Sequence, residues 1–357
     1  MSETAPAERI FRVLAIDGGG IRGIYPAAWL AAAENRVGSI GAYFDLVCGT
    51  STGGIIALAL GLGIPASTVL ELYKSRGAAI FRRRRWTFGG LLGPIYGSEI
   101  LGQALHEAFG ERLLGESRNR LCIPAVDLAT GKPKVYKTNH DPEFHVDKDL
   151  PAWKVALATS AAPVFFPAFE MCGSDALADG GLWANNPSLV GVVEARRLGF
   201  DLSDVRVLSV STGEARARMS PRAARRGGYL QYAPKALLRK LACLGLKGAR
   251  TTDLFSLLIS LQSQTVDNQM RQIGVGAYTR VTTDFGPEEY PLDGYREALE
   301  LEARATQSTQ EELTAVCKEY LYAPAQAWHE RDTTAVGFTA CGAATRAGCS
   351  SSGAQGR

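Results

Sequence analysis

The sequence predicts an α/β fold of three layers, in which helices cover both faces of a mainly parallel central sheet. Two observations lead to this prediction. The apolar run at 11–17 is typical of a buried strand, and a glycine loop and a helical segment at about 24–35 follow it. The same succession then recurs, with a strand at 43–49 and a helix at 53–62. Because 46% of the 357 residues are hydrophobic, the chain can bury the large core that such a fold needs.

The remaining elements follow from the hydrophobic runs and from the residues that interrupt them. Segment 81–97 is rich in arginine, glycine and aromatic residues, and we expect a loop or lid there. A helix at 153–160 is expected to stop before Pro163. We expect further helices at 66–77, 188–198, 254–270 and 294–320, and further strands at 121–128, 134–139, 176–179, 205–213 and 278–282.

No internal repeat and no linker divides the chain, so we expect a single domain over residues 10–330. Within it, a core at about 10–215 carries the motifs described below, and a helical C-terminal part follows at about 216–330. Residues 1–9 are expected to be flexible. Residues 331–357 are rich in small and polar residues, and we expect a disordered tail there.

Composition and charge exclude several classes of protein. The net charge of +3 is too small to indicate a nucleic-acid polymer as partner. Seven cysteines without any Cys-x-x-Cys spacing indicate free thiols in a reducing compartment. The first residues lack the basic start and apolar run of a signal peptide, and the best apolar run, 55–64, is shorter than the roughly 20 residues of a membrane span. We therefore expect a cytoplasmic protein.

The first motif that indicates chemistry is Gly49-Thr50-Ser51-Thr52-Gly53, which lies between an expected strand and an expected helix. A G-x-S-x-G sequence in this position forms a sharp turn that exposes the serine hydroxyl as a nucleophile. Gly49 and Gly53 are expected where a side chain would collide with the neighbouring strand or helix. The alternative is an ordinary buried serine at a turn, because the motif by itself is weakly specific.

The second motif, Asp17-Gly18-Gly19-Gly20-Ile21-Arg22-Gly23, allows two interpretations. It matches the G-x-G-x-x-G fingerprint of dinucleotide-binding oxidoreductases. That fingerprint expects an acidic residue about 20 positions further along the sequence, and Asp45 lies near that position. Asp45, however, comes early in a strand that leads into the Ser51 turn. The other interpretation is an oxyanion hole, since consecutive glycines expose backbone N–H groups.

The third motif is Asp179-Gly180-Gly181, an acidic residue at a strand end followed by two glycines. By itself this is a common turn, although it can bring a carboxylate close to a substrate. Serine hydrolases usually employ a histidine as the base, because its pKa lies near neutrality. None of His106, His140, His145 and His329 stands in a recognisable catalytic context, and the first three are expected to be surface or loop residues.

Taken in order, these motifs resemble the patatin-like phospholipases. The stretches 158–167 and 181–188 also look like the family's signature, so the resemblance spans about residues 10–215. It implies a patatin-like three-layer fold and a lipid acyl hydrolase with a Ser–Asp dyad. By motif match the nucleophile is Ser51 and the base is Asp179. The same match implies that Gly49, Gly53, Gly180 and Gly181 are elbow and turn positions. It also implies that the oxyanion segment contains Gly18, Gly19, Gly20 and Arg22.

Two basic stretches bear on possible partners. Residues 216–250 hold ten basic residues and no acidic one, and a second basic stretch at 72–98 includes the aromatic lid segment. Such stretches suit either a peripheral contact with an anionic membrane surface or the binding of a phosphate-bearing regulator. The chain is also similar to the CapV-type patatin-like effectors of bacterial antiphage systems. That resemblance implies membrane phospholipids as substrate, a cyclic dinucleotide as activator, and action on the inner membrane surface.

Three alternatives to a regulated phospholipase remain open at the level of sequence. They are an unregulated patatin-like esterase or thioesterase that acts on soluble acyl esters, an inactive lipid- or nucleotide-binding module, and a dinucleotide-dependent oxidoreductase. The phospholipase interpretation requires no cofactor and no metal. The sequence does not predict the oligomeric state.

Overall fold

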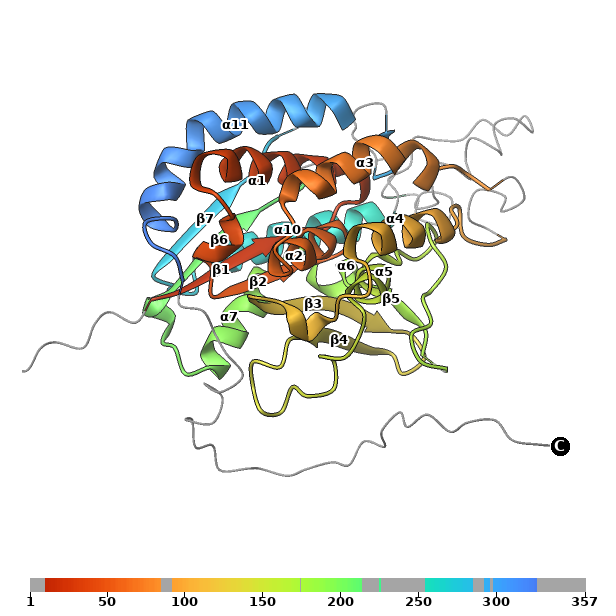
Figure 1. The fold of residues 1–357 in the computed structure, drawn as a ribbon, viewed down its shortest axis with the longest axis horizontal. Coiled ribbons are helices and arrows are strands. Elements are labelled where there is room, and N and C mark those ends of the chain that lie inside the picture. The colour runs from red at the N-terminus through yellow and green to blue at the C-terminus, as the bar shows by residue number, and fades with distance from the viewer. Residues whose placement is uncertain are drawn as a thin grey trace, which may run out of the picture.

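A computed structural model of the chain describes residues 10–84, 92–173, 175–213, 225, 254–284, 292–295 and 298–325. Its centre is a seven-stranded sheet (Figure 1). The strand order is β4-β3-β2-β1-β6-β7, with β5 paired to β3. The pairs β3–β2, β2–β1, β1–β6 and β6–β7 are parallel, whereas β4 and β5 both pair antiparallel with β3. The strands are β1 (Phe11–Ile16), β2 (Leu46–Gly49), β3 (Arg120–Asp127), β4 (Lys132–Lys137), β5 (Leu177–Asp179), β6 (Val205–Val210) and β7 (Ala277–Val281).

Helices cover both faces of the sheet, which confirms the predicted fold class (Figure 1). The 3₁₀ turn Gly20–Gly23 leads into the first helix. The helices are α1 (Ile24–Val37), α2 (Thr52–Gly61), α3 (Ala66–Ile80), α4 (Glu99–Phe109), α5 (Ala152–Ser160), α6 (Gly181–Ala184), α7 (Ser188–Arg197), α10 (Leu254–Met270) and α11 (Ala298–Glu319).

The two faces of the sheet bury different hydrophobic cores. Alternate residues of β1 divide between them, with Leu14 and Ile16 in the larger core and Val13 and Ala15 in the smaller one. The larger core is formed with α1 to α5 and α11, and the smaller one with α7 and the C-terminal half of α10. Strands buried on both faces read as continuous apolar runs, which is why the sequence pattern identified them.

Several boundaries differ from the expectation. Tyr43 belongs to a 3₁₀ turn, so β2 begins at Leu46 and not at residue 43. Strand β6 ends at Val210, and α11 begins at Ala298 and not at 294. The short helix α6 occupies part of the segment expected to be only a turn. Strand β7 confirms the strand expected at 278–282, and it extends the sheet through parallel pairing with β6.

Some sequence predictions lie outside the described residues. They concern the termini at 1–9 and 331–357, His329, the lid residues Trp86, Phe88 and Leu91, and nearly all of the basic stretch 216–250. The described parts of the lid segment, 81–84 and 92–97, are irregular as expected, and the Leu92 side chain is 75% exposed. Among the described residues, no helix combines the length and apolar character that crossing a bilayer requires.

Candidate active site

Ser51 lies at a sharp turn between β2 and α2. Its backbone adopts φ 54° and ψ −124°, a conformation that non-glycine residues rarely occupy. The flanking glycines are required by close packing. A Cβ at Gly49 would come within 2.1 Å of the Gly53 carbonyl oxygen, and one at Gly53 within 2.2 Å of the Ile16 carbonyl oxygen. The turn therefore has the geometry expected of a nucleophile elbow.

Asp179 ends β5 and faces Ser51 across the sheet edge. Its Oδ2 accepts a hydrogen bond from Ser51 Oγ at 2.6 Å, and its Oδ1 accepts one from the Gly181 amide at 2.7 Å. A Cβ at Gly180 would come within 2.3 Å of the Pro124 carbonyl oxygen, so the chain can turn here only with glycine. Burial raises the pKa of Asp179 to about 7, against the opposing effect of the two hydrogen bonds.

The glycine loop lies beside this pair. Gly19 and Gly20 line the same cavity as Ser51 and Asp179, and Gly20 has a φ of +57°. Their amides donate no hydrogen bond to any described residue. The amides of Gly18 and Arg22 instead donate to Asn185 O at 3.0 Å and to Gly19 O at 3.2 Å. Of the four residues predicted for the oxyanion segment, two thus face the cavity and two hold the loop in shape.

A buried ion pair fixes the start of this loop. Asp17 Oδ2 lies 2.6 Å from Arg280 Nη2, and both side chains are only 3% exposed. Arg280 belongs to β7 and also donates to Ser209 Oγ at 2.7 Å. Removal of one partner from such a pair is strongly destabilising, because it leaves an uncompensated buried charge. No local sequence signal links Asp17 to Arg280, since 263 residues separate them.

The cavity that contains the Ser51 hydroxyl is mainly apolar. Beside Phe165 and Phe166, Val164 holds a φ of 73°, a rare conformation for a β-branched residue. The Val164 and Phe165 carbonyls accept hydrogen bonds from Ile95 and Tyr96 of the lid segment. Helices α2, α3, α4 and α10 complete the lining with Ile55, Tyr73, Ile80, Leu101, Phe255 and Ile259. This apolar lining suits a fatty-acyl chain.

No histidine takes part in this arrangement among the described residues. His106 and His145 are exposed, as expected. His140 lies in a loop, as expected, and its side chain is buried, with only 2% exposed. Its polar partners there, Thr138 and Glu194, compensate for the burial of the ring. None of these three histidines lines the cavity, so the partner of Ser51 is a carboxylate.

Thr159 supports the strained turn at Ser51 through two hydrogen bonds. Its Oγ1 accepts a hydrogen bond from the Ser51 amide at 3.0 Å and donates one to the Pro124 carbonyl oxygen at 2.5 Å. We expect Thr159→Val to destabilise the fold by about 1–3 kcal/mol, because two buried backbone groups lose their partners. Hydrolysis of a soluble ester should fall by roughly 10- to 100-fold, since Ser51 loses its fixed position. Thermal unfolding and kinetics measure the two effects, and unchanged values for both would contradict this role.

Comparisons with known proteins agree with this geometry. The Patatin family, described as patatin-like phospholipase, matches residues 14–190. A cGAMP-activated phospholipase of Pseudomonas aeruginosa is 36% identical over 285 residues, 78% of this chain and 80% of that protein. One of Vibrio cholerae is 37% identical over 247 residues, 61% of this chain and 69% of that protein. Patatin-like protein 2 of Arabidopsis thaliana is 31% identical over 211 residues, 51% of this chain and 52% of that protein. The chain therefore belongs to the patatin-like phospholipases, which are lipid acyl hydrolases.

Proposed function

We propose that this phospholipase hydrolyses the fatty-acyl esters of membrane phospholipids with Ser51 as nucleophile and Asp179 as its base. The observation that carries the proposal is the 2.6 Å hydrogen bond from Ser51 Oγ to the buried Asp179 carboxylate, inside an apolar cavity. A serine hydroxyl needs a base within hydrogen-bond reach to attack an ester, and Asp179 is in position to act as that base.

In the acylation step, Ser51 Oγ transfers its proton to Asp179 and attacks the ester carbonyl carbon. The carbonyl oxygen becomes an oxyanion, and the amides of Gly19 and Gly20, which donate to no other group among the described residues, are suited to donate hydrogen bonds to it. Helix α2 begins at Thr52, next to the nucleophile, so its positive end adds to the stabilisation of negative charge. As the intermediate collapses, the leaving alcohol takes the proton from Asp179.

In the deacylation step, Asp179 accepts a proton from water, whose oxygen attacks the acyl-Ser51 ester. Collapse of the second intermediate releases the fatty acid and returns the proton to Ser51 Oγ. The carboxylate thus alternates between base and acid, and no histidine is needed. A carboxyl group with the ordinary pKa of about 4 would be a weak base, and burial makes Asp179 a stronger one.

The pH profile tests this role of Asp179. Its pKa is raised to about 7 by burial, and only the ionised form can act as base. We expect kcat/KM for a soluble neutral ester to rise tenfold per pH unit below about pH 7 and to level off above it. The measurement is a profile between about pH 5 and 9. A profile that is already level at pH 5, as expected for a carboxylate with the ordinary pKa of about 4, would contradict a base whose pKa is raised by burial.

Regulation by a cyclic dinucleotide is the second part of the proposal. The relatives of P. aeruginosa and V. cholerae are named cGAMP-activated phospholipases, and the matched residues cover 80% and 69% of their lengths. We infer that cGAMP also switches this enzyme on and that it then attacks the inner membrane surface during antiphage defence. The basic residues at 216–250 offer positive charge for either contact, with the nucleotide or with anionic lipid.

A lipid-product assay separates the proposal from its alternatives. Vesicles of phosphatidylethanolamine and phosphatidylglycerol are incubated with the enzyme and a panel of cyclic dinucleotides, and released fatty acid is quantified. We expect release with cGAMP and little release without it. Equal release in both cases would reject the regulation and leave the phospholipase. Hydrolysis of soluble p-nitrophenyl esters or thioesters, with none of vesicles under any condition, would support the soluble-ester alternative instead.

A further inference from the structure

Asn185, the residue directly after α6, brings an unpaired oxygen atom to the active site. It lines the same cavity as Ser51 and Asp179, and the residue is only 2% exposed. Its side-chain oxygen, Oδ1, is buried and has no hydrogen-bond partner among the described residues. A buried carbonyl oxygen without a partner costs free energy, so an atom of this kind inside a catalytic cavity indicates a function.

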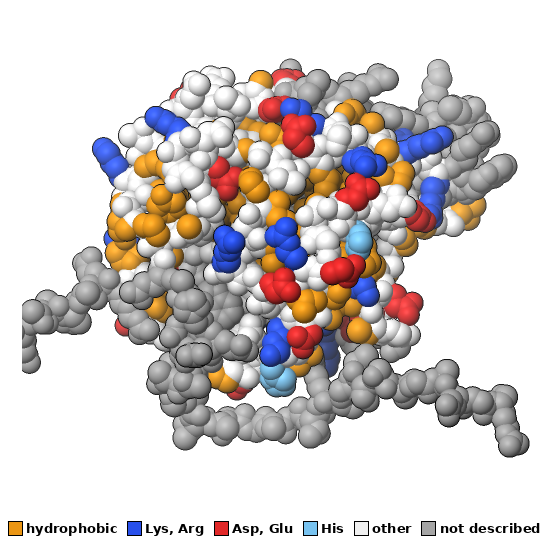
Figure 2. Space-filling view, viewed as in Figure 1, with side chains coloured by type: hydrophobic (Ala, Val, Ile, Leu, Met, Phe, Trp, Pro, Cys, Tyr) orange, Lys and Arg blue, Asp and Glu red, His pale blue; other side chains and the backbone are white. Residues whose placement is uncertain are grey.

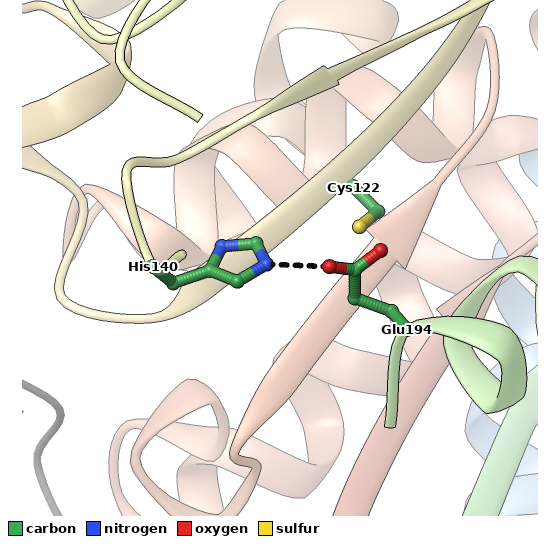
Figure 3. Close-up of side chains that lie close together, drawn as sticks. All are labelled: Cys122, His140 and Glu194. Carbon is green, nitrogen blue, oxygen red and sulfur yellow. Dashed lines mark hydrogen bonds and ion pairs between the residues drawn. The ribbon is translucent and has the colours of Figure 1, made fainter. Parts of the chain in front are cut away.

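The buried His140, on the α7 side of the sheet, shows the more usual situation. Its Nε2 lies 3.1 Å from Glu194 Oε1, and its Nδ1 lies 2.7 Å from Thr138 Oγ1. Figure 3 shows the pairing of His140 with Glu194, whose other carboxylate oxygen accepts a hydrogen bond from Lys137. The polar groups of this cluster find their partners within the protein, whereas Asn185 Oδ1 lies where a reactant can reach it.

The nitrogen of the Asn185 amide fixes the orientation of the side chain. Nδ2 donates to the Gly18 carbonyl oxygen at 3.2 Å and to Ser263 Oγ at 2.8 Å. The Gly18 carbonyl can only accept a hydrogen bond, and the Ser263 hydroxyl is itself hydrogen-bonded to the buried Asp17 carboxylate. A flipped amide would place Oδ1 against the Gly18 carbonyl oxygen. Oδ1 is therefore the end of the amide that stays unpaired.

Two glycines show how close this oxygen lies to the reacting groups. A Cβ at Gly18 would collide with Asn185 Oδ1 and would come within 3.1 Å of Ser51 Cβ. A Cβ at Gly181 would lie 3.1 Å from Asp179 Oδ1 and 3.2 Å from Asn185 Oδ1. The unpaired oxygen thus borders both the nucleophile and its base.

We propose that Asn185 Oδ1 positions the water that hydrolyses the acyl-Ser51 intermediate. This role rests on the proposed Ser51–Asp179 dyad and belongs to its second step. Once Ser51 Oγ carries the acyl group, it no longer donates a hydrogen bond to Asp179 Oδ2. Water then donates one hydrogen to Asp179 and the other to Asn185 Oδ1, which directs a lone pair of the water oxygen at the acyl carbon.

The proton and bond changes of this step balance. The water oxygen forms the new bond to the acyl carbon, and Asp179 takes the first proton. Collapse of the intermediate breaks the bond between the acyl carbon and Ser51 Oγ, which recovers that proton. The second hydrogen stays on the oxygen that came from water, so Asn185 accepts a hydrogen bond throughout and never a proton.

This role distinguishes water from an alcohol. In acylation the ester oxygen of the leaving alcohol carries no hydrogen, so Asn185 Oδ1 has nothing to accept from it. An alcohol that attacks the acyl-enzyme has one hydrogen, which goes to Asp179, and an alkyl group in place of the second. We therefore expect Asn185 to favour hydrolysis of the acyl-enzyme over transfer of the acyl group to an alcohol.

The partition of the acyl-enzyme between water and methanol tests the proposal. The full chain, with cGAMP, hydrolyses p-nitrophenyl butyrate in buffer that contains methanol, and butyrate and methyl butyrate are quantified. Both products come from the same acyl-Ser51, so their ratio does not depend on the rate of acylation. In Asn185→Ala we expect the rate of hydrolysis to fall by about 10- to 100-fold and the ratio of methyl ester to acid to rise at least about tenfold.

Two further variants separate this role from a merely structural one. Thr212 Oγ1 donates to the Gly18 carbonyl oxygen at 2.9 Å, as Asn185 Nδ2 does, but Thr212 is not among the residues that line the cavity. Thr212→Val therefore loses an anchor of the glycine loop without losing an acceptor for water, and its product ratio should equal that of the wild type. Asn185→Leu fills the space that alanine leaves, so no second water can replace Oδ1, and the ratio should rise as in Asn185→Ala.

The outcomes that contradict the proposal are distinct. A wild-type ratio in Asn185→Ala and Asn185→Leu, with acyl-Ser51 detected by mass spectrometry in the wild type, would overturn the role of Asn185 and leave the dyad intact. An equal rise in Thr212→Val would show that Asn185 acts only through the glycine loop, and would also overturn the role. A wild-type enzyme that forms no acyl-Ser51 would overturn the proposed dyad and this role together.

Discussion

Ser51→Ala is expected to abolish lipid hydrolysis, with kcat reduced by about 10⁵- to 10⁶-fold in the presence of cGAMP. The reason is geometric. Ser51 is the hydroxyl that the structure holds at a strained turn and hydrogen-bonds to a buried carboxylate. Without its oxygen no acyl-enzyme forms, and the oxyanion donors alone leave only a small residual rate. Release of fatty acid from phospholipid vesicles is the measurement.

Ser160→Ala is the matched control for this change. Ser160 lines the same cavity, but its hydroxyl donates to the Ala156 carbonyl at 2.7 Å within α5 and contacts no carboxylate of the described residues. We expect this variant to keep activity within about tenfold of the wild type, since it loses only a local hydrogen bond. A Ser51→Ala enzyme with comparable residual activity would mean that the nucleophile is another group.

Asp179→Asn is expected to lower kcat by roughly 10⁴-fold, as for other hydrolases whose carboxylate is made neutral. The hydrogen-bond pattern explains the size of the effect. The Gly181 amide donates to Oδ1, so an asparagine would direct its oxygen there and its NH₂ toward Ser51 Oγ. The side chain would then donate to the nucleophile in place of accepting its proton. Steady-state kinetics with a soluble ester measure the loss.

The stability of this variant separates a chemical defect from misfolding. Because burial raises the pKa of Asp179 to about 7, the folded chain binds this proton more tightly than the unfolded chain. The charged carboxylate therefore reduces stability above about pH 7 and has no such effect below about pH 4. Asparagine removes this cost, so the melting temperature at pH 8 should equal or exceed that of the wild type. Asp201→Asn, at a side chain that is 80% exposed, should change neither activity nor stability.

Most of the fold could be predicted because its strands are buried on both faces. The runs that became β1 and β3 contain almost only apolar residues, and such runs have few other interpretations. The start of β2 was misjudged because Phe44 is buried by packing against Tyr320 and not by sheet pairing. Helix α4 was not assigned, although Leu101, Ala104, Leu105 and Phe109 carry the spacing of an amphipathic helix.

The site residues could be proposed from sequence only as separate motifs. Ser51 and Asp179 lie 128 residues apart, and the antiparallel pairing of β5 with β3 that brings them together has no local signal. The same is true of Arg280, which pairs with Asp17 only because β7 joins the sheet beside β6. The glycine loop was identified from the sequence. Which of its amides face the cavity was not, because the Gly18 amide is held by the carbonyl of Asn185, which is distant in sequence.

The charges on the face drawn in Figure 2 give little further guidance about the binding of lipid or nucleotide. Figure 2 shows Lys and Arg side chains interspersed with Asp and Glu over the visible face, without one continuous basic area among the described residues. Exposed ion pairs such as Arg76–Glu107 and Arg84–Glu99 contribute little stability. Recognition of lipid or nucleotide is expected to depend on the basic residues that the sequence places in segments 81–97 and 216–250.

The most direct measurement of the central claim is the site and rate of reaction with a fluorophosphonate, which phosphonylates an activated serine. Protein treated in the presence of cGAMP is digested, and mass spectrometry locates the adduct. We expect a single adduct on Ser51 in the wild type and a rate at least about 10³-fold lower in Asp179→Asn. An adduct on any other residue, or wild-type labelling of Asp179→Asn, would contradict the Ser51–Asp179 dyad.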